Sequence, residues 1–130
     1  MRRASRLRRP ADFERVRSAR RSWANALLVL YVADNGGQPT RIGVTVGKRV
    51  GKAVVRNRVR RQVRECVRQD YDSIKAGRDL VFIARPSCAE SGWSELRGAV
   101  LDLLGRGRVL TGNNANKGQD VRASRPGDGA

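Results

Sequence analysis

Positive side chains gathered at one end and along one side of a predicted helix are the part of this sequence best suited to chemistry. Between residues 41 and 68 the chain carries ten Lys or Arg residues and a single acidic residue, Glu65. A helix beginning near Ala53 would add unpaired backbone N–H groups and a partial positive charge at its start. The basic residues closest to that start are Lys48, Arg49, Lys52, Arg56 and Arg58. The sequence therefore predicts a site for phosphate groups.

The helix expected from Ala53 to about Ile74 has a narrow apolar side and a broad positive side. Its apolar residues recur at helical spacing, and they are Val55, Val59, Val63, Cys66 and Val67. Most of the remaining circumference is polar and basic: Arg56, Asn57, Arg58, Arg60, Arg61, Arg64 and Arg68. Like charges four residues apart repel each other, so the pattern favours a helix that faces a polyanion over a solvated surface helix. The amide of Asn57 can orient an arginine or contact a sugar or base edge.

The composition supports a nucleic-acid partner and argues against a protein catalytic site. The chain has 28 Lys and Arg residues against 12 Asp and Glu, a net charge of +16, and binding to a polyanion relieves the resulting self-repulsion. It has no His, and its acidic residues are scattered, so neither a histidine base nor a carboxylate cluster for metals is expected. Cys66 and Cys88 lack zinc-site spacing. We expect them to be two small buried or half-buried thiols of a cytosolic protein.

Hydrophobic periodicity predicts the order helix, strand, strand, helix, strand, helix. Helices are expected from Pro10 to about Arg20, over the basic segment, and after a cap at Ser91, where Trp93 belongs to the apolar stripe. Strands are expected at Ala26–Ala33, Arg41–Gly47 and Asp79–Arg85. The fold class is α/β, an α+β sandwich in which a small central sheet of about four strands packs against about three helices.

Two strands have faces that bear on function. Both faces of Ala26–Ala33 are apolar, with Val29 and Tyr31 on the face opposite Leu28 and Leu30. We therefore expect protein to cover at least one of the two faces. The other strand carries Gly43, Thr45 and Gly47 on one side. A strand face this small leaves room for another group to approach closely.

The ends of the chain differ in composition from its middle. We expect residues 1–9 to form a basic mobile arm, residues 10–104 a single RNA-binding domain, and residues 105–130 a disordered tail. No apolar run is long enough to cross a membrane. The basic N-terminus lacks the apolar stretch of a secretory signal.

The segment RIGVTVGKRVGKAVVRNRVRRQVRECVRQ, residues 41–69, resembles the signature of the bacterial ribonuclease P protein component. The hallmark of that family is an Arg-Asn-Arg helix, here Arg56-Asn57-Arg58. An upstream ADFERV and VLY and a downstream FIAR occur in the family's order and spacing. The resemblance extends from residue 6 to about residue 104.

This resemblance implies a ribonucleoprotein enzyme whose RNA subunit performs Mg²⁺-dependent hydrolysis of the 5′ leader of precursor tRNA. The protein would be its accessory subunit, without catalytic residues or a metal site of its own, bound 1:1 to the RNA in the cytoplasm and not to a membrane. The resemblance also implies an unusual left-handed βαβ crossover, against the general rule of handedness.

Carried over by matching position, the resemblance assigns two sets of contacts. The candidates for binding the RNA subunit are Lys48, Arg49, Lys52, Arg56, Asn57, Arg58, Arg60, Arg61, Arg64 and Arg68. The candidates for binding the leader, in a cleft between the sheet and the first helix, are Phe13, Arg17, Val29 and Tyr31. Arg17 stands where the family often has a second aromatic residue. Base stacking would there be reduced, or replaced by guanidinium stacking and phosphate pairing.

Two other functions are compatible with parts of the pattern. Composition alone fits a structural RNA-binding protein such as a small ribosomal protein. A DNA-binding module with its basic helix in a major groove is a third reading, but such helices usually carry mixed Asn, Gln, Ser and Arg residues and follow a partner helix after a short turn. That arrangement is not evident in this sequence.

Overall fold

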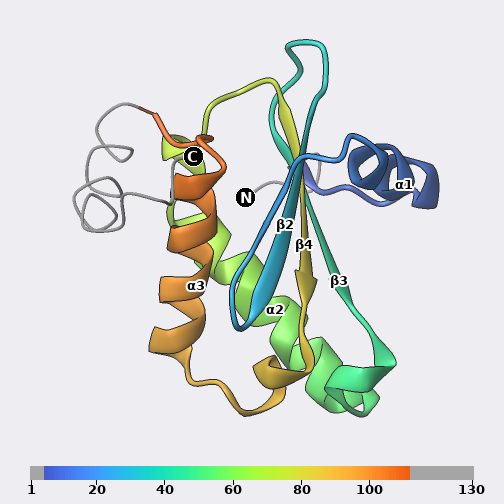
Figure 1. Ribbon diagram of the computed structural model, residues 1–130, viewed down its shortest axis with the longest axis vertical. Coiled ribbons are helices and arrows are strands. Elements are labelled where there is room, and N and C mark those ends of the chain that lie inside the picture. The colour runs from blue at the N-terminus through green and yellow to red at the C-terminus, as the bar shows by residue number, and fades with distance from the viewer. Residues whose placement is uncertain (1–4, 112–130) are drawn as a thin grey trace.

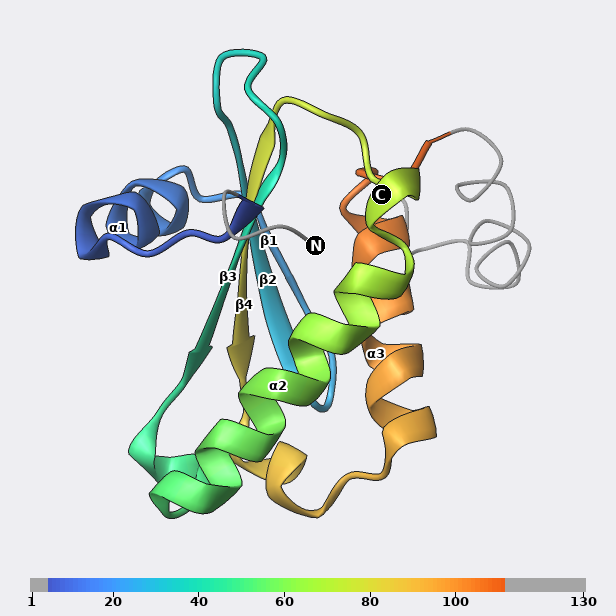
Figure 2. The same ribbon diagram turned by 180° about the vertical axis from the view of Figure 1, so that it is seen from behind.

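A four-stranded sheet lies between one short helix and two longer ones (Figures 1 and 2). The computed structural model describes residues 5–111. The helices are α1 (Pro10–Ser18), α2 (Ala53–Gln69) and α3 (Trp93–Arg106), and the strands are β1 (Ser22–Ala24), β2 (Leu28–Asp34), β3 (Arg41–Val46) and β4 (Arg78–Ala84). The predicted α+β sandwich of about four strands and three helices is confirmed.

The sheet is mixed, with strand order β1-β2-β4-β3. Strand β2 runs antiparallel to both β1 and β4, whereas β3 and β4 are parallel neighbours connected through α2. Since a parallel pair needs a long connection, the basic helix is the crossover of a βαβ unit. The left-handed sense of that crossover stays a prediction.

The main core lies between the sheet and the pair α2 and α3. Leu28, Leu30 and Val32 on one face of β2 are fully buried there. They pack with the apolar stripes of the two helices, which include Val59, Val63, Cys66 and Val67 from α2 and Leu96, Val100, Leu103 and Leu104 from α3. Removing aliphatic side chains of this size from water contributes roughly 1.5–3 kcal/mol each. The apolar stripes expected from the sequence therefore hold α2 and α3 against the sheet.

A smaller cluster holds α1 on the opposite face of the sheet. Val16 is fully buried there, and the Phe13 ring is partly buried. A Cβ atom at Gly43 would lie only 2.7 Å from two carbons of that ring. The close approach predicted for this glycine face is therefore made by Phe13 of α1.

A buried carboxylate also ties α1 to the sheet. The side chain of Asp79, in β4, is fully buried and accepts hydrogen bonds from Arg41 (3.1 and 2.7 Å), Asn35 (2.9 Å) and Arg15 of α1. Burial alone would raise the pKa of Asp79, but these hydrogen bonds outweigh it and hold the pKa below its usual value. The sequence pattern did not single out this residue.

The packed domain extends beyond both boundaries expected from the sequence. Leu7, which we expected in a mobile arm, is only 4% exposed, and its N–H donates to the Ile42 carbonyl (2.9 Å). After α3, Val109 and Leu110 are buried, so the chain remains packed past residue 105. A single leucine such as Leu7, or an apolar pair such as Val109 and Leu110, is too short to show a hydrophobic period, so the sequence pattern does not predict its burial. The expectations for residues 1–4 and 112–130 lie outside the described residues.

Two expectations at the start of α3 are wrong. Gly92, and not Ser91, precedes the helix, and the Gly92 N–H donates to the Glu95 carboxylate (3.0 Å). Ser91 instead donates its hydroxyl to the Cys88 carbonyl (3.0 Å). Trp93, the first residue of the helix, is 39% exposed and not part of the core.

Candidate nucleic-acid interface

The turn before α2 presents three basic side chains to solvent. A short 3₁₀ helix, Lys48–Val50, follows β3, and Gly51 then turns the chain with φ of 154°, a value that favours glycine. Lys52 is the extended residue immediately before the helix. The side chains of Lys48, Arg49 and Lys52 are exposed and form no ion pair within residues 5–111. They surround the positive end of α2, as the sequence predicted.

The first arginines of α2 are oriented by neutral oxygens. Arg56 donates to the Gly51 carbonyl (3.1 Å), and Arg58 donates to the Ala89 carbonyl (2.7 Å). Arg60 donates to the Asn57 side-chain oxygen (2.8 Å), so Asn57 does orient a neighbouring arginine. A bond to a carbonyl or amide oxygen fixes a guanidinium without neutralising it. The helix therefore keeps its positive charge while three of its arginines are positioned.

Carboxylates neutralise very little of this basic side. Among the described residues, Arg68 is the one member of the predicted set that pairs with a carboxylate, Glu65, one turn earlier. Arg61 is exposed and has no partner in that range. The pKa of Arg64 is lowered by its partial burial and by Arg6, Arg60 and Arg8. The predicted residues lie together on one turn and one helix, which runs across the near side in Figure 2.

The predicted leader residues meet on the opposite face of the sheet. Val29 and Tyr31 point away from the main core, and Phe13 and Tyr31 pack in the cluster beneath α1. Their rings are partly buried, so packing against the protein uses much of each aromatic surface. Arg17 is exposed on α1 and makes no side-chain hydrogen bond within the described range.

The sheet register adds two residues to this face. Val29 is paired with Ile83 of β4, and Ile83 is paired with Thr45 of β3. Val29 and Ile83 are half-buried and Thr45 is exposed, so these three form a partly exposed row next to α1, which we call the sheet strip. The sequence did not identify Ile83 and Thr45 as site residues, although both alternate in their strands in phase with this face. To place Ile83 and Thr45 beside Val29, one must know which strands pair, and those strands are far apart in the chain.

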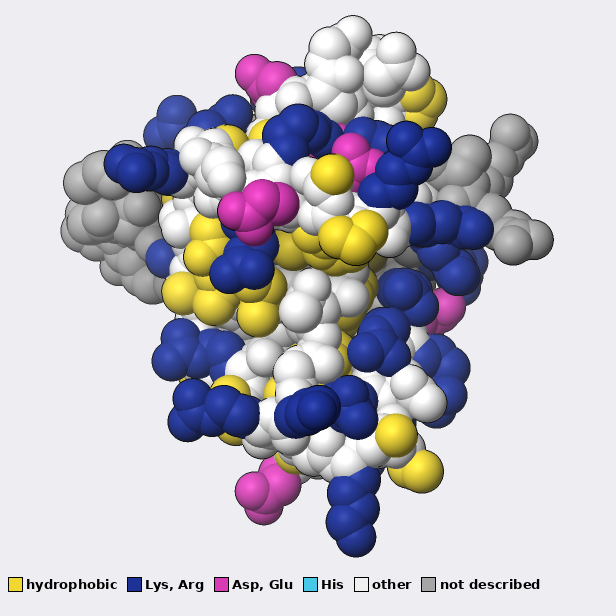
Figure 3. All heavy atoms as spheres, turned by 90° about the vertical axis from the view of Figure 1, so that its right-hand side faces the viewer, with side chains coloured by type: hydrophobic (Ala, Val, Ile, Leu, Met, Phe, Trp, Pro, Cys, Tyr) yellow, Lys and Arg dark blue, Asp and Glu magenta, His cyan; other side chains and the backbone are white. Residues whose placement is uncertain are grey.

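Positive side chains border this apolar surface. In the view onto the α1 side of the molecule, hydrophobic side chains occupy the middle and Lys and Arg side chains surround them (Figure 3). Apolar and aromatic surfaces stack on unpaired bases, while the cations attract the backbone phosphates. This face can therefore hold a single-stranded nucleic acid with little dependence on its sequence.

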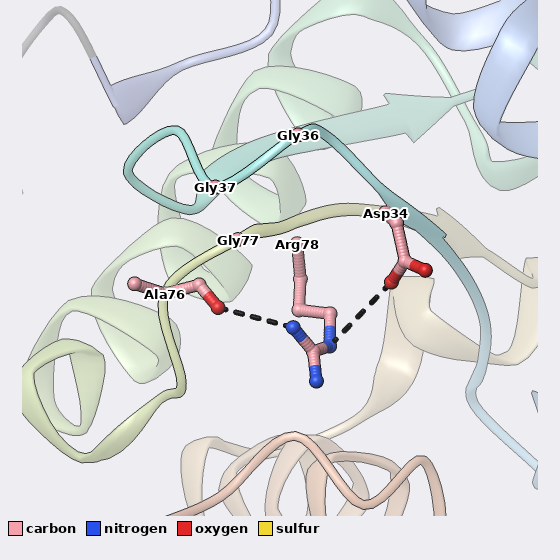
Figure 4. A pocket seen from close by; sticks show the side chains of 6 residues that line it. All are labelled: Asp34, Gly36, Gly37, Ala76, Gly77 and Arg78. Carbon is pink, nitrogen blue, oxygen red and sulfur yellow. Dashed lines mark hydrogen bonds and ion pairs between the residues drawn. The ribbon is translucent and has the colours of Figure 1, made fainter.

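Other features of the described residues do not contribute to these surfaces. Cys66 and Cys88 are free and buried, and burial raises the pKa of both thiols, that of Cys66 to about 11. An open pocket lies between the loops 34–37 and 76–78, where the Arg78 side chain binds Asp34 and the Ala76 carbonyl (Figure 4). It lies at the far end of the sheet from the turn before α2 (Figure 2).

The described residues do not offer a metal site or a membrane span. No three of their His, Cys, Asp and Glu side chains come close enough together to hold a metal ion. None of the helices in the described part of the chain is long and apolar enough to cross a membrane.

Comparison with known proteins connects these surfaces to one family. The family model described as ribonuclease P matches residues 1–108, which include every candidate residue. The chain belongs to the ribonuclease P protein family. The ribonuclease P protein component of Roseiflexus castenholzii is 48% identical over 113 residues, covering 86% of this chain and 93% of that one. The component of Alkaliphilus oremlandii is 41% identical over 104 residues, covering 80% and 91%.

The fold agrees with solved structures of the ribonuclease P family. The Staphylococcus aureus RNase P protein superimposes with a TM-score of 0.76 at 28% identity, covering 82% of this chain and 98% of that one. The chain is thus a protein component of ribonuclease P, an endoribonuclease of tRNA processing, and a partner of the ribonuclease P RNA. The ribosomal-protein alternative is not favoured.

Proposed function

We propose that the basic side of α2 and the turn before it bind the ribonuclease P RNA. The observation that carries this proposal is that, among the described residues, only one of the predicted contacts pairs with a carboxylate: Arg68 pairs with Glu65. The contacts are Lys48, Arg49, Lys52, Arg56, Asn57, Arg58, Arg60, Arg61, Arg64 and Arg68. A folded RNA supplies closely spaced phosphates, and guanidinium groups bind phosphate through two parallel hydrogen bonds.

The opposite face is proposed to bind the 5′ leader of precursor tRNA. Phe13, Val29 and Tyr31, with Ile83 and Thr45, offer an apolar surface to unpaired bases, and Arg17 offers a positive charge to a phosphate. Because an apolar surface does not read base edges, this face suits leaders of varied sequence.

The hydrolysis itself is assigned in this proposal to the RNA subunit and its Mg²⁺ ions. The described side chains do not fit a protein-held metal centre, and the chain has no histidine to act as a base. The protein contributes affinity and position, binding one RNA per chain in the cytoplasm.

Reconstitution tests the proposal. The chain is added to a bacterial ribonuclease P RNA at low Mg²⁺, and removal of the leader from precursor tRNA is measured. We expect restored activity, and a roughly three- to tenfold loss of RNA affinity for Arg61→Ala, a loss that shrinks as salt rises. Lys75→Ala, an exposed cation outside the proposed contacts, is the control. Equal affinities for both variants and the parent protein would remove α2 from the interface.

A further inference from the structure

The N-terminal segment lies along the outer edge of the sheet. Arg6 forms an isolated parallel bridge with Ile42 of β3, the strand at that edge. The Tyr71 hydroxyl, just after α2, donates to the Thr40 carbonyl (2.5 Å) and accepts a hydrogen bond from the Ser5 hydroxyl (3.1 Å). Leu7 is buried in the cluster beneath α1, whereas Arg6 and Arg8 are exposed. The segment is thus held at three points, and the side chains of Arg6 and Arg8 are left outside.

The positive charges of these two arginines act on a guanidinium of α2, that of Arg64. Arg64 is partly buried, and its Nε atom is shielded from solvent without a hydrogen-bond acceptor within the described range. The neighbouring charges that act on it are Arg6, Arg60 and Arg8, all of the same sign. A shielded donor without an acceptor, surrounded by like charges, lowers the stability of the free protein.

Within residues 5–111, none of these four arginines forms an ion pair. Arg60 has the Asn57 oxygen as its partner, and that oxygen is neutral. The missing partner is therefore an anion that approaches from outside. Since the cluster is continuous with the basic side of α2 through Arg60 and Arg64, the same RNA can supply it.

We propose that Arg6, Arg8, Arg60 and Arg64 form a phosphate site, the edge site, which binds a backbone phosphodiester of the ribonuclease P RNA. This inference rests on the proposed function of α2, and it extends the RNA-binding surface from that helix across the outer edge of β3. Two non-bridging phosphate oxygens match the planar donors of guanidinium groups. The N-terminal segment is then part of the RNA-binding surface of the domain.

Two single variants of the segment test the edge site in the full chain. Arg6→Ala removes a cation whose charge acts on Arg64, while Arg9→Ala removes an equal charge that is exposed at the start of α1 and lies outside the proposed site. We expect Arg6→Ala to weaken binding to ribonuclease P RNA about three- to tenfold and to reduce the log–log salt slope by about one. Arg9→Ala should change affinity by less than about twofold. Equal effects of the two variants would overturn the edge site.

A third variant separates binding from folding. Arg64→Gln should leave the thermal unfolding midpoint unchanged or raise it at low salt, because repulsion is relieved, and should still weaken RNA binding. A lower midpoint for Arg64→Gln would assign Arg64 to the fold and overturn the proposal. In the Arg6→Ala, Arg64→Gln double variant the losses should be less than multiplicative, since both residues contact one phosphate. If Arg61→Ala weakens binding and Arg6→Ala does not, the edge site fails while the proposed function stands.

Discussion

Asp79 shows how much one side chain outside every motif contributes to this molecule. Its carboxylate is fully buried and is surrounded by donors from three segments, Arg15, Asn35 and Arg41. A buried charge is tolerated only when it is paired and hydrogen-bonded. Asp79 therefore fixes where α1 lies over the sheet, and with it the position of Phe13.

We expect Asp79→Asn to lower the free energy of unfolding by about 2–4 kcal/mol, at the low end for a broken buried pair because the arginine partners are partly exposed. The pKa of Asp79 is lower in the folded than in the unfolded chain. Its contribution is therefore present above the unfolded pKa and is lost as pH falls through the folded pKa. When urea unfolding is measured from pH 7 downward, the free energy of unfolding of the parent protein should fall, and that of Asp79→Asn should fall less. Parallel plots of unfolding free energy against pH for the two proteins would contradict this.

At the scale of elements, α1 depends on a contact that one added methyl group would disturb. A Cβ atom at residue 43 would lie 2.7 Å from the Phe13 ring. We expect Gly43→Ala to destabilise the fold by about 1–3 kcal/mol as the ring shifts. Precursor tRNA affinity should fall as well, whereas affinity for the RNA subunit should not change. A variant with normal stability would show that Phe13 moves aside freely. Thr45→Ala, on the same strand face but exposed, is the control for stability alone, because Thr45 belongs to the proposed leader-binding surface.

For helix α2 we expect one substitution to strengthen RNA binding. Glu65 is the acidic residue on its basic side, and its hydrogen bonds with Arg68 lower the pKa of the carboxyl, so it stays charged at neutral pH. Glu65→Gln frees Arg68 from its ion pair. We expect tighter binding to ribonuclease P RNA, by roughly two- to fivefold at low salt, and a steeper salt dependence. Unchanged or weaker binding in a filter or anisotropy assay would place Arg68 outside the interface.

The elements that the sequence predicted well are those whose burial repeats with a regular period. The stripe from Val55 to Val67 and the alternation in β3 identify a face without any knowledge of its neighbour. The missed features depend on neighbours distant in sequence. Strand β1 is three residues long, Ile83 joins the sheet strip only through its pairing with Val29, and Leu7 is buried by one bridge to β3. Asp79 resembled any other charged residue at a strand start.

On the scale of the whole molecule, the two proposed binding surfaces lie on opposite sides of one sheet. The basic side of α2 is on one side, and the sheet strip and α1 are on the other (Figures 1 and 2). The core between them contains fully buried apolar side chains. One chain can therefore contact the RNA subunit and a substrate strand at the same time, without competition between them.

This separation predicts that the two functions can be removed independently. Val29→Ser should weaken binding of precursor tRNA with a long leader to the reconstituted enzyme, by roughly three- to tenfold, because apolar contact with the bases is lost. It should not affect mature tRNA or affinity for the RNA subunit. Arg61→Ala should reduce RNA affinity and leave the leader-length dependence of the assembled complex intact. A loss of leader-length dependence in both variants would show that the surfaces are coupled.

The bridge between Arg6 and Ile42 also protects the protein when no RNA is bound. An uncovered edge strand exposes backbone donors and acceptors to which another chain can add a strand, and such pairing starts aggregation. The N-terminal segment occupies that position beside β3. At the opposite edge of the sheet, β1 offers only three residues for pairing. A shortened chain that begins at Pro10 would lose this cover, and its copies would be expected to associate through their sheets.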